Sequence, residues 1–118
     1  HGVQSTKDPA LMQRLVQDRI PLTVCPLSNL KLRVFPDLAQ HNLGALLDAG
    51  LVATVNSDDP AYFGGYINEN FTQTFAATGL TAQQAWQLAA NSFEASFIDA
   101  AAKARHLDRL DAVFASFA

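Results

Sequence analysis

Two adjacent carboxylates, Asp58 and Asp59, follow the apolar run "LVATVN" with only Ser57 between. Neighbouring aspartates repel each other unless water, a cation or a proton separates their charges. Their position at the end of a predicted strand therefore indicates a place where a cation can compensate them. An acidic pair before Pro60 is also typical of a turn and a helix cap, because aspartate accepts hydrogen bonds from backbone N–H groups. The two roles are compatible.

Two further polar groups fall where strands are expected to end. His1 and Gly2 suit the end of a strand, and imidazole is suited to acid–base chemistry near pH 7. Ser28 and Asn29 follow the apolar run "IPLTVCP" and either form a plain turn or position a pocket. In folds of parallel strands, ligands bind beyond the carboxyl ends of the strands. We therefore expect these groups to lie near the acidic pair.

The elements that must position these groups follow from the apolar pattern. The pattern predicts a helix after Asp8-Pro9, a strand in "IPLTVCP", a loop at "PLSNLKL", a helix at 42–49 closed by Gly50, a strand in "LVATVN", and then helices. This alternation is typical of βα units with parallel strands. So few strands cannot close a barrel, and an open sheet of this size leaves exposed edges. The sequence therefore looks like part of a larger sheet.

The later helices are marked by their caps and their aromatic side chains. Thr81 and Gln84 form a capping box, and a stripe of apolar residues predicts a helical tail. The aromatic residues expected in the core are Phe71, Phe75, Trp86, Phe114 and Phe117.

Composition limits the class of protein. The 118 residues are 49% hydrophobic and carry a net charge of −3, as expected of one globular domain over 1–118. The charge and a pI near 5.4 argue against nucleic acid or an anionic membrane as partner. No apolar stretch reaches the about 18 residues of a membrane span. The single cysteine, Cys25, is expected in the core and predicts a reducing compartment, by default the cytoplasm.

Three motifs together resemble the C-terminal third of the adenosine and adenine deaminases, which are zinc hydrolases on a (β/α)8 barrel. They are "HG" at 1–2, "CPLSNLKL" at 25–32 and "NSDDP" at 56–60. Their order and spacing match across nearly the whole chain, and "SDDPAYFGGY" looks more like the adenine branch. The resemblance implies an α/β fold in which 1–118 supplies the C-terminal βα units of one deaminase barrel domain.

The resemblance also implies a reaction and a role for three residues. The reaction is the zinc-dependent hydrolytic deamination of adenine, a small purine, to hypoxanthine and ammonia. Asp58 would be a Zn²⁺ ligand, Asp59 would bond a ring nitrogen of the purine, and His1 would orient or deprotonate the attacking water.

The chain departs from the family pattern in what it lacks. The family's other zinc ligands are three histidines, two of them in an HxH motif, and its proton-donating glutamate lies in an HAGE motif; neither motif occurs here. These parts would lie upstream, so the chain alone is expected to be inactive. The remaining histidines, His41 and His106, lack the right neighbours and are expected to be ordinary surface residues.

Other interpretations remain open at this point. The nearest is a deaminase of the nucleoside adenosine, although the bulky Tyr62 and Phe63 after the acidic pair favour the free base by crowding the space of a ribose. A receiver-type signalling domain also places adjacent acids at a strand end, but its further aspartate and lysine are not evident. A helix-rich interaction domain without chemistry is supported by the tail "DAAAKAR".

Overall fold

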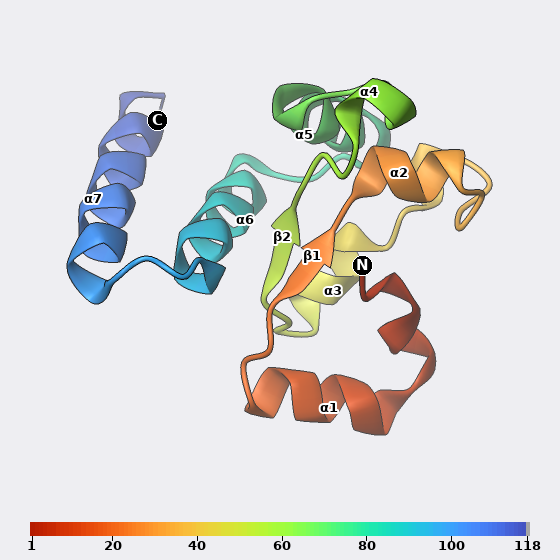
Figure 1. The fold of residues 1–118 in the computed structure, drawn as a ribbon, viewed down its shortest axis with the longest axis horizontal. Coiled ribbons are helices and arrows are strands. Elements are labelled where there is room, and N and C mark those ends of the chain that lie inside the picture. Colours follow the sequence, from red (N-terminus) through yellow and green to blue (C-terminus); the bar gives the residue numbers. More distant parts are fainter. Residues whose placement is uncertain (118) are drawn as a thin grey trace.

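Two short parallel strands lie at the centre of the computed structural model, which describes residues 1–117. Strand β1 (Leu22–Val24) pairs with β2 (Ala53–Val55), with Thr23 opposite Thr54 (Figure 1). All of β2 is buried, as expected of a strand covered on both faces. The parallel pairing confirms the predicted βα organisation, and both strands lead toward the same end of the molecule.

Helices follow each strand. In chain order the helical elements are the 3-10 helix η1 (Val3–Lys7), α1 (Pro9–Gln17), α2 (Pro26–Lys31), the 3-10 helix η2 (Leu38–Gln40), α3 (Leu43–Asp48), α4 (Pro60–Phe63), α5 (Ile67–Thr78), α6 (Ala82–Ala95) and α7 (Ala100–Ser116). The prediction of a loop at 26–32 was wrong, because most of it forms α2. Pro26 occupies the first turn, where its fixed φ favours a helix start. Six residues are too short to show a helical apolar period.

The predicted helix ends are confirmed. The Asp8 carboxylate accepts a hydrogen bond from the Leu11 amide at the start of α1. Gly50, after α3, has a φ of 86°, a left-handed conformation that glycine adopts without strain. Thr81 and Gln84 form the reciprocal capping box of α6.

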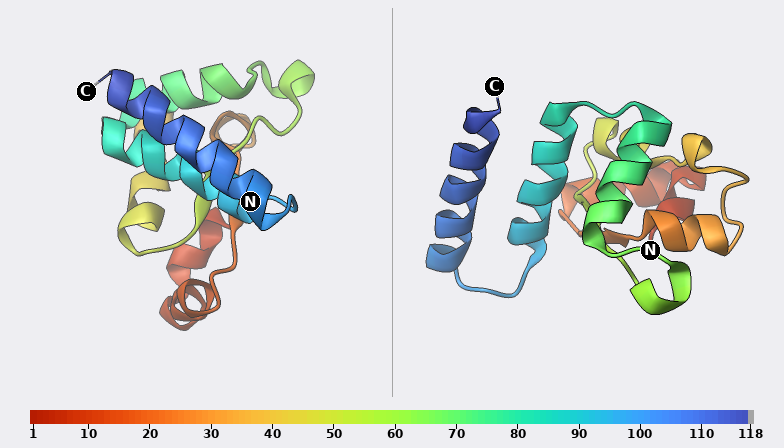
Figure 2. Two further views of the ribbon diagram at one scale, coloured as in Figure 1. Left: turned by 90° about the vertical axis from the view of Figure 1, so that its left-hand side faces the viewer. Right: turned by 90° about the horizontal axis from the view of Figure 1, so that it is seen from above.

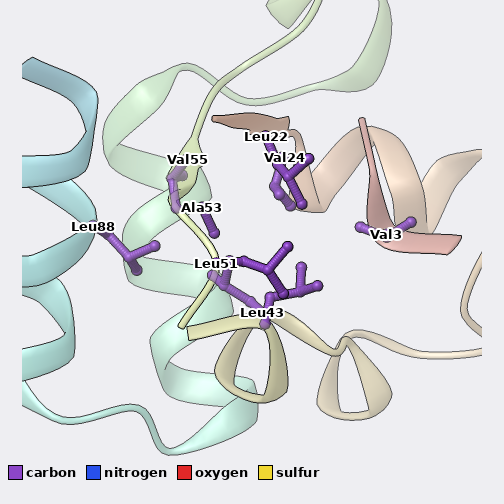
Figure 3. Packing of buried hydrophobic residues seen from close by; sticks show 9 residues of the cluster. Val3, Leu22, Val24, Leu43, Leu51, Ala53, Val55 and Leu88 are labelled. Carbon is purple, nitrogen blue, oxygen red and sulfur yellow. The ribbon is translucent and has the colours of Figure 1, made fainter. Parts of the chain in front are cut away.

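The core lies between the strands and the helices that cover them. Leu43 and Leu46 of α3 and Leu88 of α6 are fully buried. Figure 3 shows Leu88 pointing toward β2. The cluster also includes buried side chains of both strands: Leu22, Val24, Ala53 and Val55. The strands are thus held rigidly, which fixes the loops that leave their ends.

The C-terminal helix lies outside this core. Helix α7 packs on α6 and not on the strands, as Figures 1 and 2 both show. Of the aromatic residues expected in the core, Phe71 and Phe75 pack against it, and Trp86 and Phe114 are half-buried. The prediction for Phe117 was wrong, since its side chain is 86% exposed at the end of α7.

Within residues 1–117, no helix combines the length and the apolar character that crossing a bilayer requires.

Candidate active site

Asp58 occupies a strained turn just beyond β2. Pairing of the strands continues into this loop, because the Asn56 amide N–H donates to the Val24 carbonyl at 2.8 Å and its side-chain Nδ2 donates to the same oxygen at 3.1 Å. Asp58 then takes a φ of 57°, in the left-handed region where aspartate is among the better-tolerated residues. Strain of this kind is found where a side chain must be held at a functional position.

Two side chains from distant parts of the sequence converge on the Asp58 carboxylate. Ser28 Oγ, fully buried in α2, donates to Asp58 Oδ2 at 2.7 Å. His1 Nε2 lies 3.3 Å from the same oxygen. The three groups predicted at strand ends thus lie together, and Ser28 contacts the site instead of only forming a turn.

His1 is held by Asn29 and by the glycine that follows it. Asn29 Nδ2 lies 3.2 Å from His1 Nδ1. Gly2 has a φ of 82°, and a Cβ at this position would lie 2.7 Å from a methyl carbon of Leu22 in β1. The chain can therefore pass this close to β1 only with glycine at position 2. The "HG" pair thus joins a titratable ring to the residue that allows its approach.

Asp59 has a different role from its neighbour. Its Oδ1 accepts a hydrogen bond from the Tyr62 amide at 3.1 Å, which makes Asp59 the N-cap of α4. Within residues 1–117, no hydrogen bond joins Asp59 to His1, Ser28 or Asp58. The cap predicted for the acidic pair therefore belongs to Asp59, and Asp58 is left for the cluster. The predicted contact of Asp59 with a purine stays a prediction.

Cys25 lies beneath this cluster at the end of β1. It is 2% exposed, which confirms its predicted place in the core. Its Sγ lies within 4.8 Å of ligand atoms of His1 and Asp58. Burial, followed by the nearby Asp58 charge, raises the pKa of the thiol to about 11. At neutral pH the thiol is therefore protonated and donates to the Thr23 carbonyl at 3.4 Å, whereas metals bind the thiolate.

The carboxylate of Asp58 fits one position in a zinc shell. Its Oδ2 is engaged by Ser28 and His1, while its Oδ1 makes no hydrogen bond within the part of the chain that the structure describes. Catalytic zinc typically takes roughly three protein ligands of the Asp, Glu, His or Cys type. The described residues thus suit a site in which Asp58 supplies a single ligand.

One functional neighbour was missed by sequence reasoning. His41 was expected at the surface, and this prediction was wrong: its side chain is 6% exposed and contacts Asn29. Burial lowers its pKa to about 4, so the ring is neutral at pH 7. Nothing in the sequence around His41 signals this contact, because the two partners come from different elements. His106 is exposed, as predicted.

Parallel βα units that carry a histidine and an aspartate at their strand ends have the layout of a segment of a (β/α)8 barrel, in which active sites lie at this end of the strands. Comparison with known proteins gives the family. The family model described as adenosine deaminase matches residues 1–113. This chain therefore belongs to the adenosine deaminase family.

The relatives confirm the family and the fold. The adenine deaminase of Albidiferax ferrireducens is 74% identical over 99% of this chain, and that of Trichlorobacter lovleyi is 63% identical over 97%. The crystal structure of an adenine deaminase from Arthrobacter aurescens covers 94% of the chain with a TM-score of 0.92 at 47% identity. An amidohydrolase of Burkholderia ambifaria with bound Zn covers 98% with a TM-score of 0.79 at 25% identity.

The chain spans only about a third of these proteins: 34% and 33% of the two curated relatives, and 34% and 35% of the two crystallised chains. The likeness to the two crystallised chains confirms the fold predicted from sequence, part of a (β/α)8 hydrolase barrel.

Proposed function

We propose that residues 1–118 form the C-terminal βα units of a zinc-dependent adenine deaminase, an enzyme that hydrolyses adenine to hypoxanthine and ammonia. The observation that carries this proposal is the convergence of His1 and Ser28 on the Asp58 carboxylate at the ends of β1 and β2. The names of the relatives support the substrate, and the zinc bound in one structural neighbour supports the metal. We also propose a cytoplasmic location, which is supported by the single cysteine within these 118 residues.

The reaction replaces the amino group of the purine by an oxygen from water. Bound zinc, with Asp58 among its ligands, would lower the pKa of water so that hydroxide is present near neutral pH. His1 donates a hydrogen bond from its Nε2 proton to the attacking oxygen and so orients it, while the ring carbon gains a C–O bond. The bond from this carbon to the amino nitrogen then breaks, and the nitrogen takes up the proton that the water gave up and leaves as ammonia.

Asp59 holds the purine in this scheme. Its Oδ1 is committed to the cap of α4, and its Oδ2 accepts no hydrogen bond within residues 1–117. The second oxygen can therefore bond a ring nitrogen while the cap remains intact. Anchoring of the α4 turn fixes the direction of the carboxylate, which lowers the entropic cost of binding the ring.

The substrate test compares adenine with adenosine. We expect the complete enzyme to favour adenine in kcat/KM by at least about a hundredfold, because a steric clash discriminates more strongly than the roughly 1–3 kcal/mol of one methylene contact. The loss of ultraviolet absorbance on deamination measures both rates. Equal or higher kcat/KM for adenosine would contradict the choice of substrate and leave the deaminase class intact.

The side chain that excludes the ribose can be tested in the same assay. Tyr62 is 78% exposed, whereas Phe63 is half-buried and lies edge-to-face against it, with ring centroids 4.9 Å apart. Phe63→Ala should therefore raise kcat/KM for adenosine, and Tyr62→Ala serves as the matched control with a smaller effect. No gain in either variant would remove these rings from the account of specificity.

The 118-residue chain by itself should neither retain zinc nor deaminate adenine. One carboxylate does not hold a catalytic zinc ion, which takes roughly three protein ligands. Elemental analysis after dialysis, together with the absorbance assay, checks both statements. Stoichiometric zinc in the dialysed chain would show that the ligand set is assigned wrongly.

A further inference from the structure

A continuous row of hydrogen bonds joins the start of α3 to His1. The Leu43 backbone amide lies 3.1 Å from His41 Nδ1. His41 Nε2 lies 2.9 Å from Asn29 Oδ1, and Asn29 Nδ2 lies 3.2 Å from His1 Nδ1. His41 and Asn29 are both buried, so water does not compete for these groups.

The direction of every bond in the row follows from its first donor. A backbone N–H can only donate, so His41 Nδ1 must be an acceptor without a proton. The imidazole then carries its proton on Nε2 and donates to Asn29 Oδ1. The lowered pKa of His41 agrees with this neutral state of the ring.

The same reasoning extends to His1. With Oδ1 of Asn29 accepting from His41, its Nδ2 is the group that faces His1 and donates to Nδ1. A ring that accepts at Nδ1 carries its proton on Nε2, the nitrogen 3.3 Å from Asp58 Oδ2. Ser28, next to Asn29 in α2, holds Asp58 through a separate hydrogen bond, so one helix positions both His1 and Asp58.

We propose that Asn29 and His41 are positioning residues that fix the tautomer and the ring orientation of His1. The proposal rests on the proposed function, in which His1 acts on the attacking water. His1 needs such support, because its side chain is 33% exposed and a free imidazole would exchange tautomers and rotate. The start of α3 thereby determines which nitrogen of His1 presents a proton to the site.

Asn29→Asp in the complete enzyme tests this arrangement. Aspartate has nearly the same shape and still accepts from His41, but it presents an acceptor to His1 Nδ1 and so favours the opposite tautomer. We expect kcat to fall by about tenfold or more with zinc content unchanged. KM should stay within about threefold, because substrate contacts are not removed.

Asn42→Asp is the matched control. The Asn42 side chain adjoins His41 in sequence but donates to the Val3 carbonyl at 2.9 Å and takes no part in the row. We expect this variant to keep kcat within about twofold of the parent enzyme. An equal loss of kcat in both variants would reduce Asn29 to a structural residue and overturn the proposal.

His41 is tested by a pair of substitutions. His41→Leu leaves Asn29 Oδ1 without its donor, whereas His41→Gln can supply an amide N–H to the same oxygen. The glutamine variant should therefore retain more kcat than the leucine variant. Equal kcat in the parent enzyme and the leucine variant would exclude His41 from the row.

Nitrogen-15 NMR of the histidine-labelled complete enzyme reads the tautomer directly and does not depend on activity. The His1 signals are identified by their loss in His1→Gln. We expect Nδ1 of His1 without a proton and Nε2 with one, and the reverse in Asn29→Asp. A protonated Nδ1 in the parent enzyme would overturn the proposal even if adenine is deaminated. The expected tautomer in an enzyme that does not deaminate adenine would support the row and contradict the proposed function instead.

Discussion

Asp58→Asn in the complete enzyme is expected to abolish zinc binding and deamination together. Asparagine tolerates the left-handed φ of 57° at this position, so the substitution removes charge without adding backbone strain. Loss of residues that merely support a metal ligand costs about 10–100-fold in affinity or activity. Removal of the ligand itself should therefore lower kcat/KM by more than about a hundredfold. Metal analysis and the absorbance assay measure the two effects.

Variants at Asp59 provide the control for this experiment. Asparagine caps a helix about as well as aspartate, whereas alanine costs about 0.5–2 kcal/mol at an N-cap. Asp59→Asn should therefore keep zinc and the stability of the protein but lose kcat/KM for adenine, and Asp59→Ala should also lose stability. Normal rates in Asp59→Asn would reduce this residue to a helix cap. Zinc retained at normal occupancy in Asp58→Asn would contradict the assignment of the ligand.

His1→Ala is expected to lower kcat by on the order of a hundredfold or more while zinc stays bound, as the loss of a positioned acid–base group typically does. His1 Nε2 lies beside Asp58 Oδ2, which also accepts a hydrogen bond from Ser28. Because Ser28 still holds the Asp58 carboxylate when His1 is removed, zinc should stay bound. Steady-state kinetics with parallel metal analysis checks this split.

His106→Ala is the control, because this exposed histidine of α7 stacks on Phe93 of α6, away from the site residues. It should leave kcat unchanged. An unchanged kcat in His1→Ala would remove His1 from the mechanism, and joint loss of zinc and activity would make it a ligand instead.

Much of the fold could be predicted because its signals are local. The caps at Asp8, Gly50 and Thr81 depend on residues within one turn, and each is confirmed. The two strands were marked by short apolar runs, which predict burial whatever covers them. Their parallel order then placed His1 and Ser28 beside Asp58 before any contact was known.

The parts that sequence reasoning missed depend on contacts between distant residues. Helix α2 is too short for a periodic pattern, so only Pro26 marked its start. His41 lies between two short helical elements, and its burial results from packing against α2. The residues next to His41 in the sequence give no sign of this contact. Phe117 continues an apolar stripe of α7, yet α7 contacts α6 along one side and leaves this end uncovered. The separate roles of Asp58 in the cluster and Asp59 at the helix cap depend on the left-handed turn at Asp58, which the sequence does not predict.

The most direct test of the account is the crystal structure of the complete enzyme with zinc, with the distance from the ion to the Asp58 carboxylate as the deciding measurement. We expect one oxygen of Asp58 at about 2.0–2.2 Å from the zinc, as is usual for a carboxylate ligand, with Ser28 still donating to Oδ2. A zinc ion held entirely by other residues, with Asp58 bonded only to Ser28 and His1, would contradict it.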